Sequence, residues 1–293
     1  MDLESFIILV FCTIDDFLRA CRPKLRQRGP APTLADSEIL TIETVGEFLG
    51  LDTDRGLYAY FRRHFGHFFP GLRAVHRTTF GRQAANLWVV KDALWQHLSA
   101  ATHRDAALVI VDSLPVPVCR FARAHRCRGF AGVAAFGHDA LAHQTYSGLR
   151  LHLRISWPGV ITAATLAPAN AADLAVAPEL LVGQVGGVLG DGTYWSPRLR
   201  AELAPQGLAL LAPPHRTSAR TERWPRWLVQ TRRRIETVLS QLTERYHAKR
   251  VWARDVWHLT ARWLRKLVSH TMAVLLCQRT GLSPLTFARL ITA

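Results

Sequence analysis

The sequence predicts an α/β fold, in which a mixed β-sheet with flanking helices follows an all-helical region and precedes a helical tail. Apolar residues recur at helical spacing through residues 1–105. From residue 106 on, short β-rich apolar runs alternate with helical segments in the order β, ββ, α, β, α, β, α. After residue 246 the pattern is helical to the end of the chain. We therefore expect domains at residues 1–105, 106–250 and 251–293.

The first element is the apolar run "FIILVFC" at residues 6–12. It is far shorter than the roughly 18 residues that span a bilayer. Asp2 and Glu4 precede it, whereas a secretory signal carries positive charge there. This run predicts a buried helix in a cytoplasmic protein that does not contact a membrane.

Three further helices are expected in the N-terminal region. Thr33 and Asp36 resemble a capping box, and Gly50 stops the helix that follows them. Asp54 is expected to cap the second helix, and the third is expected over residues 77–100. This arrangement is typical of a helix-turn-helix unit that contacts DNA ends, and equally of a small helical bundle.

Strands begin with "AALVIVDSLPVPV" at residues 106–118. The alternation in "GLRLHLRISW", residues 148–157, predicts a half-buried strand, and Pro158-Gly159 turns it into a hairpin. The remaining elements are a helix at 173–181 capped by Asn170 or Asp173, a strand at 186–194, a helix at 196–203, a strand at 207–213, a loop at 214–230 and a helix at 232–246.

Charge is the strongest global signal, because the chain carries a net charge of +15. Residues 1–105 hold 13 basic and 12 acidic residues, so nearly all of the excess lies in residues 106–293. A basic field of this size attracts a polyanion, for which nucleic acid is the usual partner, although a membrane surface or ribosomal RNA would also satisfy the charge alone.

The five cysteines are widely spaced and odd in number, which argues against a disulfide framework. Cys119, His125 and Cys127 lie near one another in the sequence, but no CxxC pair supports a zinc site.

Three carboxylates carry the functional prediction. Asp112 and Asp191 each follow an apolar run, and Glu236 lies at the edge of the apolar stripe of the helix at 232–246. Each has a plain alternative: an Asx-turn for Asp112, a hairpin Asp-Gly for Asp191, and a surface pair with Arg232 or Arg233 for Glu236. Together, they would supply the hard oxygen ligands that Mg²⁺ prefers, and two such ions can clamp a phosphoryl transfer.

The chain resembles the DDE transposases of bacterial insertion sequences, most closely insertion sequence family 982. The matching motifs are "VDSLPVPVC" at 111–119, "GLRLHL" at 148–153, "APAN" with the following Asp173, "GDGTY" at 190–194 and "RRRIETVLSQLTE" at 232–244. Relatives commonly have lysine directly after the second aspartate, where this chain has Gly192 and Thr193, and lysine at Arg150.

The resemblance implies a ribonuclease H-like core in which Asp112, Asp191 and Glu236 are catalytic and bind two Mg²⁺ ions, with Mn²⁺ as a substitute. The implied reaction cuts the ends of the element and joins the exposed 3′-hydroxyls to target DNA. The implied partners are the terminal inverted repeats, the target DNA and further copies of the chain in a bacterial cytoplasm, at the nucleoid. An inactive or nuclease-only DNA-binding relative is the alternative.

Further DNA contacts are expected from basic residues near these carboxylates. Arg232, Arg233 and Arg234 suit phosphate because guanidinium pairs with it through two hydrogen bonds, although a solvated charge run is the alternative. Arg150 and His152 on the central strand are also predicted DNA contacts. Base stacking by Trp224, Trp227, Trp252, Trp257 or Trp263 is a further interpretation, against an ordinary packing role.

Overall fold

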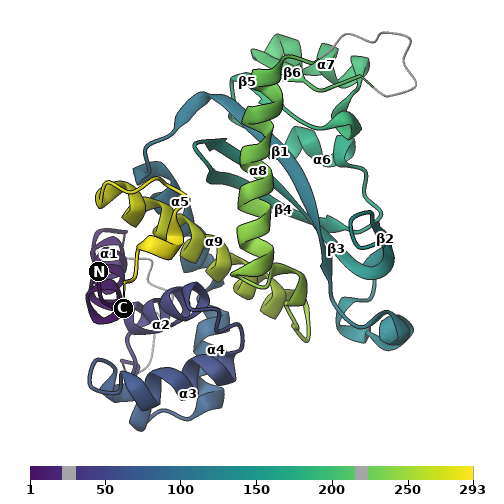
Figure 1. The fold of residues 1–293 in the computed structure, drawn as a ribbon. Helices are drawn as coiled ribbons and strands as arrows, with labels where there is room; N and C mark the ends of the chain where they lie inside the picture. The colour runs from purple at the N-terminus through teal and green to yellow at the C-terminus, as the bar shows by residue number, and fades with distance from the viewer. Residues whose placement is uncertain (22–30, 215–223, 293) are drawn as a thin grey trace. The chain divides into compact units, whose positions relative to one another are not determined.

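A computed structural model describes residues 1–21, 31–214 and 224–292. The chain forms two compact units (Figure 1). Residues 1–102 and the residues from 242 onward make up the first unit, and residues 103–241 make up the second. Helices from both ends of the sequence therefore share one core.

The first unit is helical. It contains α1 (Leu3–Cys21), α2 (Asp36–Phe48), α3 (Asp54–His64), α4 (Arg77–Asn86), α5 (Trp88–Ala101) and α9 (Val256–Arg279), with short 3₁₀ helices at Pro70–Arg73, Ala248–Arg250 and Phe287–Arg289. The tail after residue 246 is thus interrupted by non-helical backbone on both sides of α9.

The ends of these helices correct several predictions. Ala35, rather than Thr33, precedes α2, and its N–H donates to Glu38 at 2.6 Å. Thr53, rather than Asp54, caps α3 by accepting from the N–H of Gly56 at 3.0 Å. The helix expected at 77–100 is two helices that meet at Leu87.

A buried ionic network ties α2, α5 and α9 together. Lys91 donates to Glu43 at 2.8 Å, and Lys266 donates to Glu47 at 2.7 Å, with every one of these side chains at most 2% exposed. Arg265 lies between them, bonded to Glu47 and 3.6 Å from Glu43. Charges that are buried in this way must remain paired, because an isolated one is costly.

The second unit is built on a six-stranded sheet. Its strands are β1 (Asp105–Pro117), β2 (Ala135–Asp139), β3 (Gln144–Trp157), β4 (Val160–Pro168), β5 (Gly186–Leu189) and β6 (Leu208–Leu211), and its helices are α6 (Asp173–Leu180), α7 (Pro197–Leu203) and α8 (Arg226–Glu244). The order across the sheet is β2-β3-β1-β5-β6, with β4 beside the rest of β3. β1 and β3 are antiparallel, whereas β1, β5 and β6 are parallel.

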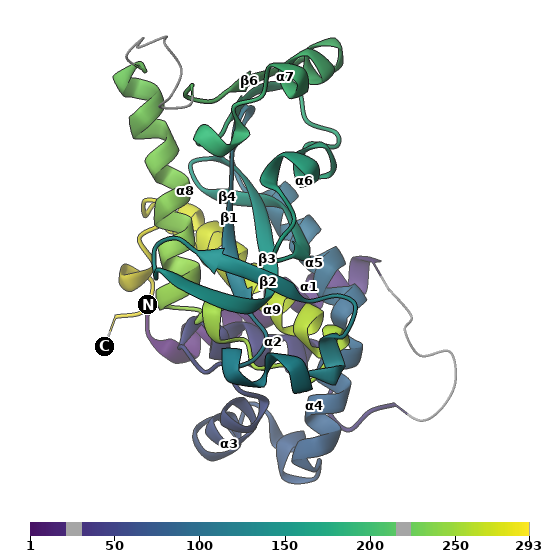
Figure 2. The same ribbon diagram turned by 90° about the vertical axis from the view of Figure 1, so that its right-hand side faces the viewer.

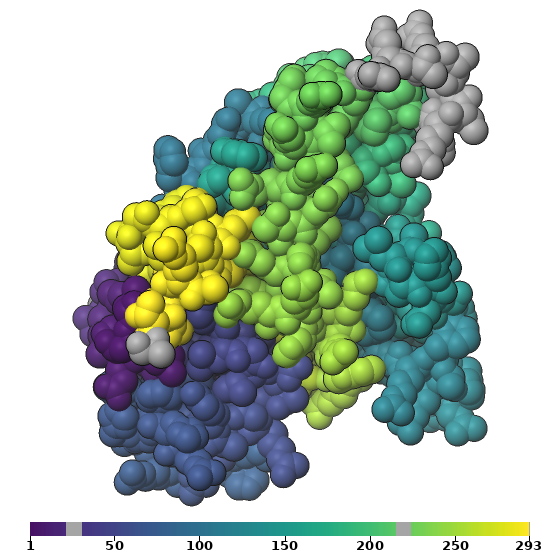
Figure 3. All heavy atoms as spheres, viewed as in Figure 1, coloured from purple at the N-terminus to yellow at the C-terminus, as the bar shows by residue number. Residues whose placement is uncertain are grey.

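Helices cover both faces of this sheet (Figure 2). Helices α6 and α7 pack on one face, where Val109, Val111 and Val188 meet Leu180 and Leu199. Helix α8 lies on the other face, and its outer side is uncovered in the space-filling view (Figure 3). The mixed α/β prediction is confirmed, as is the hairpin between β3 and β4.

Other elements of the sheet unit differ from the expectation. β2 was not predicted, and β3 is buried on both faces rather than half-buried, because β1 and β4 flank it and helices cover the sheet. Ala172 precedes α6, so neither Asn170 nor Asp173 is its N-cap. Of the loop expected at 214–230, residues 215–223 lie outside the described residues, and α8 already begins at Arg226.

Within the described ranges, none of the helices combines the length and the apolar character needed to cross a membrane.

Candidate active site

Asp112 lies within β1, where strand alternation determines its direction. Val109 and Val111 point into the core under α6 and α7, so Asp112 belongs to the opposite face, which α8 covers. The Asp112 side chain is 22% exposed, and Arg232 of α8 lies 3.7 Å from it. The carboxylate of Asp112, in the middle of a central strand, is thus accessible from the face of the sheet on which α8 lies.

Asp191 follows β5, the parallel neighbour of β1. Ile110 pairs with Leu189 in the sheet register, so Asp112 and Asp191 each lie two residues beyond a paired position. Because adjacent parallel strands run in the same direction, both carboxylates lie at the same level of the sheet, where β5 ends and β1 continues beside β3.

The turn after β5 fixes Asp191. Its carboxylate accepts from the N–H of Thr193 at 2.9 Å and from the Thr193 hydroxyl. Gly190 allows the chain to bend here, because a Cβ at this position would lie only 2.8 Å from the ring of Tyr194. "GDGTY" therefore folds around a buried tyrosine that anchors the turn.

The electrostatics of Asp112 show how closely the carboxylates gather. Burial, together with the negative charges of Asp191 and Asp173, raises the pKa of Asp112 to about 6, although the N–H of Ser113 and the charge of Arg232 oppose this shift. A cation bound here would relieve this repulsion.

Glu236 approaches the same place from α8. It is 52% exposed and pairs with Arg232, one turn earlier, at 2.7 Å. The two outer nitrogens of Arg232 therefore face different predicted ligands, Nη2 facing Glu236 and Nη1 facing Asp112. Glu236 is thus linked to Asp112 through a guanidinium in this conformation.

Asp173 is a fourth carboxylate in the site, to which the sequence reasoning gave no role. It is the first residue of α6, and its side chain is 11% exposed. Its Oδ2 lies 3.5 Å from Arg150 and 3.5 Å from the Thr193 hydroxyl, and its Oδ1 lies 3.3 Å from Nδ1 of His152. Its place three residues after Asn170 of "APAN", one of the matching motifs, was the available signal.

The pKa of Asp173 reflects these neighbours. Burial alone would raise it, but contacts with His152 and Ser113 and the charge of Arg150 outweigh burial and lower the pKa below its ordinary value. Ser113 and His152 occupy paired positions on β1 and β3, so they share one face of the sheet. Asp173 therefore remains ionised beside the other two aspartates.

Tyr194 lies among the three aspartates. It is 1% exposed, and burial, followed by the charges of Asp173, Asp112 and Asp191, raises its pKa. All three carboxylates thus act on one phenol, which stays protonated and can donate a hydrogen bond.

The predicted DNA-binding residues occupy different environments. Arg233 is exposed, and its side chain has no acidic partner among the residues described. Arg234 stacks over the ring of Trp157 at 4.7 Å. Arg150 faces Asp173, and His152 is only 1% exposed, so a DNA contact by His152 would require its ring to become accessible.

The donor set suits a hard divalent cation, since it consists of carboxylates whose mutual repulsion a cation would offset. In this conformation, however, no group of three His, Cys, Asp or Glu side chains within residues 1–21, 31–214 and 224–292 is spaced to hold one ion. Arg232 stands between Asp112 and Glu236, so bringing Glu236 to a metal with the aspartates requires this guanidinium to move.

Two comparisons with known proteins find similarities. A cryo-EM structure of the piggyBac transposase synaptic complex with hairpin DNA is similar, with a TM-score of 0.51 at 9% sequence identity, covering 98% of this chain and 78% of that one. A comparison with curated protein sequences finds no match. The family model described as a transposase DDE domain matches residues 102–253, which is more than half of the chain. This chain belongs to the transposase DDE domain family.

Proposed function

We propose that the protein is the transposase of a bacterial insertion sequence, similar to family 982, which cuts the ends of its element and joins them to target DNA. The observation that carries this proposal is the register of β1 and β5, which brings Asp112 and Asp191 to the same level of the sheet. Glu236 faces the same place through Arg232.

A ribonuclease H-like core is part of this proposal. The order β4-β3-β1-β5-β6 supports it, in which β3 and β4 form an antiparallel hairpin, β1, β5 and β6 are parallel, and helices cover both faces. The similar structure shares its fold at low sequence identity, and so supports only the architecture.

Asp112, Asp191 and Glu236 would hold two Mg²⁺ ions, for which Mn²⁺ would substitute. When bound, the ions would polarise the scissile phosphate and activate the attacking oxygen. Asp173 would hold Arg150 and His152 in place, since it contacts both.

The reaction would proceed in two displacements at phosphorus. First, water attacks the phosphodiester at an element end, and the bond from phosphorus to the 3′ oxygen breaks, leaving a 3′-hydroxyl. Second, this hydroxyl attacks a target phosphodiester, so that one phosphodiester bond replaces another. Each step loses one proton from the attacking oxygen and delivers one to the leaving oxygen.

The expected partners are terminal-repeat DNA, target DNA and further copies of the chain. Arg233, which is exposed on α8, is suited to contact a phosphate. Cytoplasmic location at the nucleoid follows from a DNA substrate.

Strand-transfer assays with labelled terminal-repeat DNA and Mg²⁺ test the proposal. We expect Asp112→Asn, Asp191→Asn and Glu236→Gln each to reduce joining by at least roughly 10²-fold. The chain provides a matched control in Glu202, which is 51% exposed and pairs at 2.8 Å with Arg198 at the same i,i+4 spacing. Glu202→Gln should leave joining unchanged.

Other outcomes distinguish the alternatives. Cleavage without joining, lost in the same variants, would indicate a nuclease. DNA binding without either reaction, indifferent to metal and to these variants, would indicate an inactive relative.

A further inference from the structure

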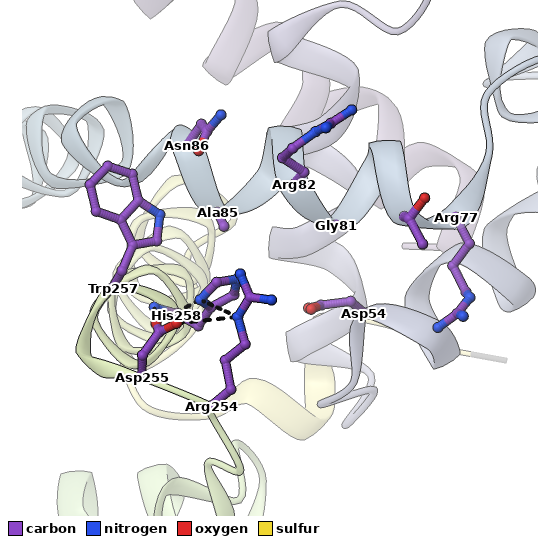
Figure 4. A pocket seen from close by; sticks show the side chains of 11 residues that line it. Asp54, Arg77, Gly81, Arg82, Ala85, Asn86, Arg254, Asp255, Trp257 and His258 are labelled. Atoms are coloured by element: carbon purple, nitrogen blue, oxygen red, sulfur yellow. Dashed lines mark hydrogen bonds and ion pairs between the residues drawn. The ribbon is translucent and has the colours of Figure 1, made fainter. Parts of the chain in front are cut away.

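A pocket of about 660 Å³ lies within the helical unit, formed by α3, α4 and the beginning of α9 (Figure 4). Its volume is in the range of small-molecule sites. Gly81 and Ala85, one turn apart on α4, create the hollow because they carry almost no side chain. Trp257 and Asn86 lie toward one end in this view, and Arg77 lies toward the other.

The acidic residues of this pocket are already neutralised. Asp54 accepts from Arg262 at 2.8 Å and from Arg265 at 2.7 Å. Burial would raise its pKa, but these two arginines lower it to about 2. Asp255 caps α9 by accepting from the N–H of His258 at 2.9 Å, and it also pairs with Arg254.

Two arginines of the pocket, in contrast, are available to bind a ligand. Arg77 and Arg82 on α4 are exposed, and neither has an ion pair or a side-chain hydrogen bond with the described part of the chain. Arg254 is also 77% exposed, but it already pairs with Asp255, so the uncompensated positive charge comes from Arg77 and Arg82. With both aspartates compensated, the pocket attracts an anion, and guanidinium is the side chain best suited to phosphate.

An aromatic surface lies beside these cations. Trp257 is 49% exposed and meets Trp88 edge-on, with ring centroids 5.9 Å apart. An indole that is held by a second indole offers a rigid face on which a base can stack. The amide of Asn86 provides both a donor and an acceptor for a base edge.

We propose that this pocket binds an unpaired nucleotide of a DNA strand, with its base on Trp257 and with two phosphates of the strand on Arg77 and Arg82. The inference rests on the proposed function for its choice of DNA as the source of the nucleotide. A nucleotide that remains paired cannot present its base to the pocket, so the site selects single-stranded or frayed DNA over duplex.

The test measures binding of the full chain to a fluorescein-labelled strand of about 20 thymidines, and to a duplex of the same length, by fluorescence polarisation in EDTA. We expect Arg77→Ala/Arg82→Ala to weaken strand binding about tenfold and to reduce the slope of log K against log salt by about 1.4, which is two single-strand phosphate contacts. Arg63→Ala/Arg73→Ala, which removes two exposed arginines of the same unit outside the pocket, should change binding less than about twofold.

Two further pairs of variants test stacking and shape. Trp257→Ala should weaken strand binding about tenfold, whereas Trp257→Phe retains it. Trp252→Ala is the control, since Trp252 is 51% exposed and lies outside the pocket, and it should leave strand binding unchanged. At Gly81, a Cβ would lie 3.8 Å from Asp54, so Gly81→Ala fits, whereas Gly81→Leu would fill the hollow and weaken binding while favouring the helix.

Equal effects of pocket and control variants, or none, would overturn the inference. So would competition by thymidine monophosphate as effective as the strand, which would indicate a site for free nucleotides. Because binding is measured without metal, it is independent of catalysis. If the wild-type protein joins DNA but the pocket variants bind the strand normally, only the pocket is refuted. If the pocket variants bind the strand weakly but the wild-type protein never joins DNA, only the proposed function is refuted.

Discussion

Arg232 pairs with Glu236 at 2.7 Å across one turn of α8 and, with its other outer nitrogen, lies 3.7 Å from Asp112. Arg198 and Glu202 on α7 form the same i,i+4 pair at 2.8 Å without a carboxylate of the site beside them. The local geometry of the two pairs is thus alike, and their surroundings differ. This contrast separates the surface-pair interpretation of Glu236 from the functional one.

Replacing Arg232 should weaken DNA binding and strand transfer, whereas replacing Arg198 should not. If Arg232 leaves Glu236 to contact a phosphate, Arg232→Ala removes one phosphate contact, which lowers the salt slope of duplex binding by about 0.9 and strand transfer by about tenfold. Arg198→Ala should leave both unchanged. Binding isotherms at several salt concentrations give the slopes, and equal slopes for the two variants would support a purely structural pair.

Asp173 should prove as necessary as the predicted carboxylates. Asp173→Asn keeps the shape but removes the charge that faces Arg150 and His152, leaving a partly buried guanidinium uncompensated. We expect joining to fall more than about tenfold, with unfolding free energy reduced by about 1–3 kcal/mol. Strand transfer and urea denaturation of the same preparation measure the two effects. Asp139→Asn, on the neighbouring strand β2, is the control, and wild-type joining by Asp173→Asn would contradict the role.

The sequence was most informative where a functional residue comes directly after an apolar run that forms a strand. Asp112 and Asp191 were identified because each follows an apolar run, and parallel pairing brings such positions together. Asp173 follows no strand directly, and its role depends on where the start of α6 meets β3. The short strand β2 was missed because "AFGHD" has only one large apolar residue and a glycine.

The helical unit was less predictable. No glycine or proline marks the break at Leu87, so one helix was expected where two occur. The packing of α9 against helices more than 150 residues earlier leaves no local signal. Glu43, Lys91 and Arg265 would be read as surface residues from their type, although all three are buried.

The pairing of Lys91 with Glu43 gives a stability prediction. Lys91 donates to Glu43 at 2.8 Å and to the carbonyl of Ala84 at 2.9 Å, within the core. Lys91→Met leaves Glu43 without its nearest cation, at a cost of about 3–5 kcal/mol. The double variant Lys91→Met/Glu43→Leu should recover most of this lost stability, because it leaves no unpaired charge: Arg265 retains its ion pairs with Glu47 and Asp54. Urea denaturation of the double variant and of each single variant measures these changes in the free energy of unfolding. If the two single changes add up to that of the double variant, the residues are not a coupled pair.

His270 makes the helical unit sensitive to acid. It is fully buried between Tyr246 and Phe287, and burial lowers its pKa from 6.5 to about 3. Between these values the unfolded chain binds a proton that the folded chain does not, so stability falls as the pH falls below 6.5. From pH 7.5 to pH 5, we expect a loss of about 2 kcal/mol from this group.

Urea denaturation at the two pH values isolates this contribution when wild type is compared with His270→Gln. The variant lacks the titrating group, so its unfolding free energy should change by about 2 kcal/mol less over this range, whatever its absolute stability. His64→Gln, at an exposed position of the same unit, should retain the wild-type dependence. If the pH dependence of His270→Gln equals that of wild type, the histidine is already protonated in the folded unit, and its burial among aromatic rings does not exclude the charge.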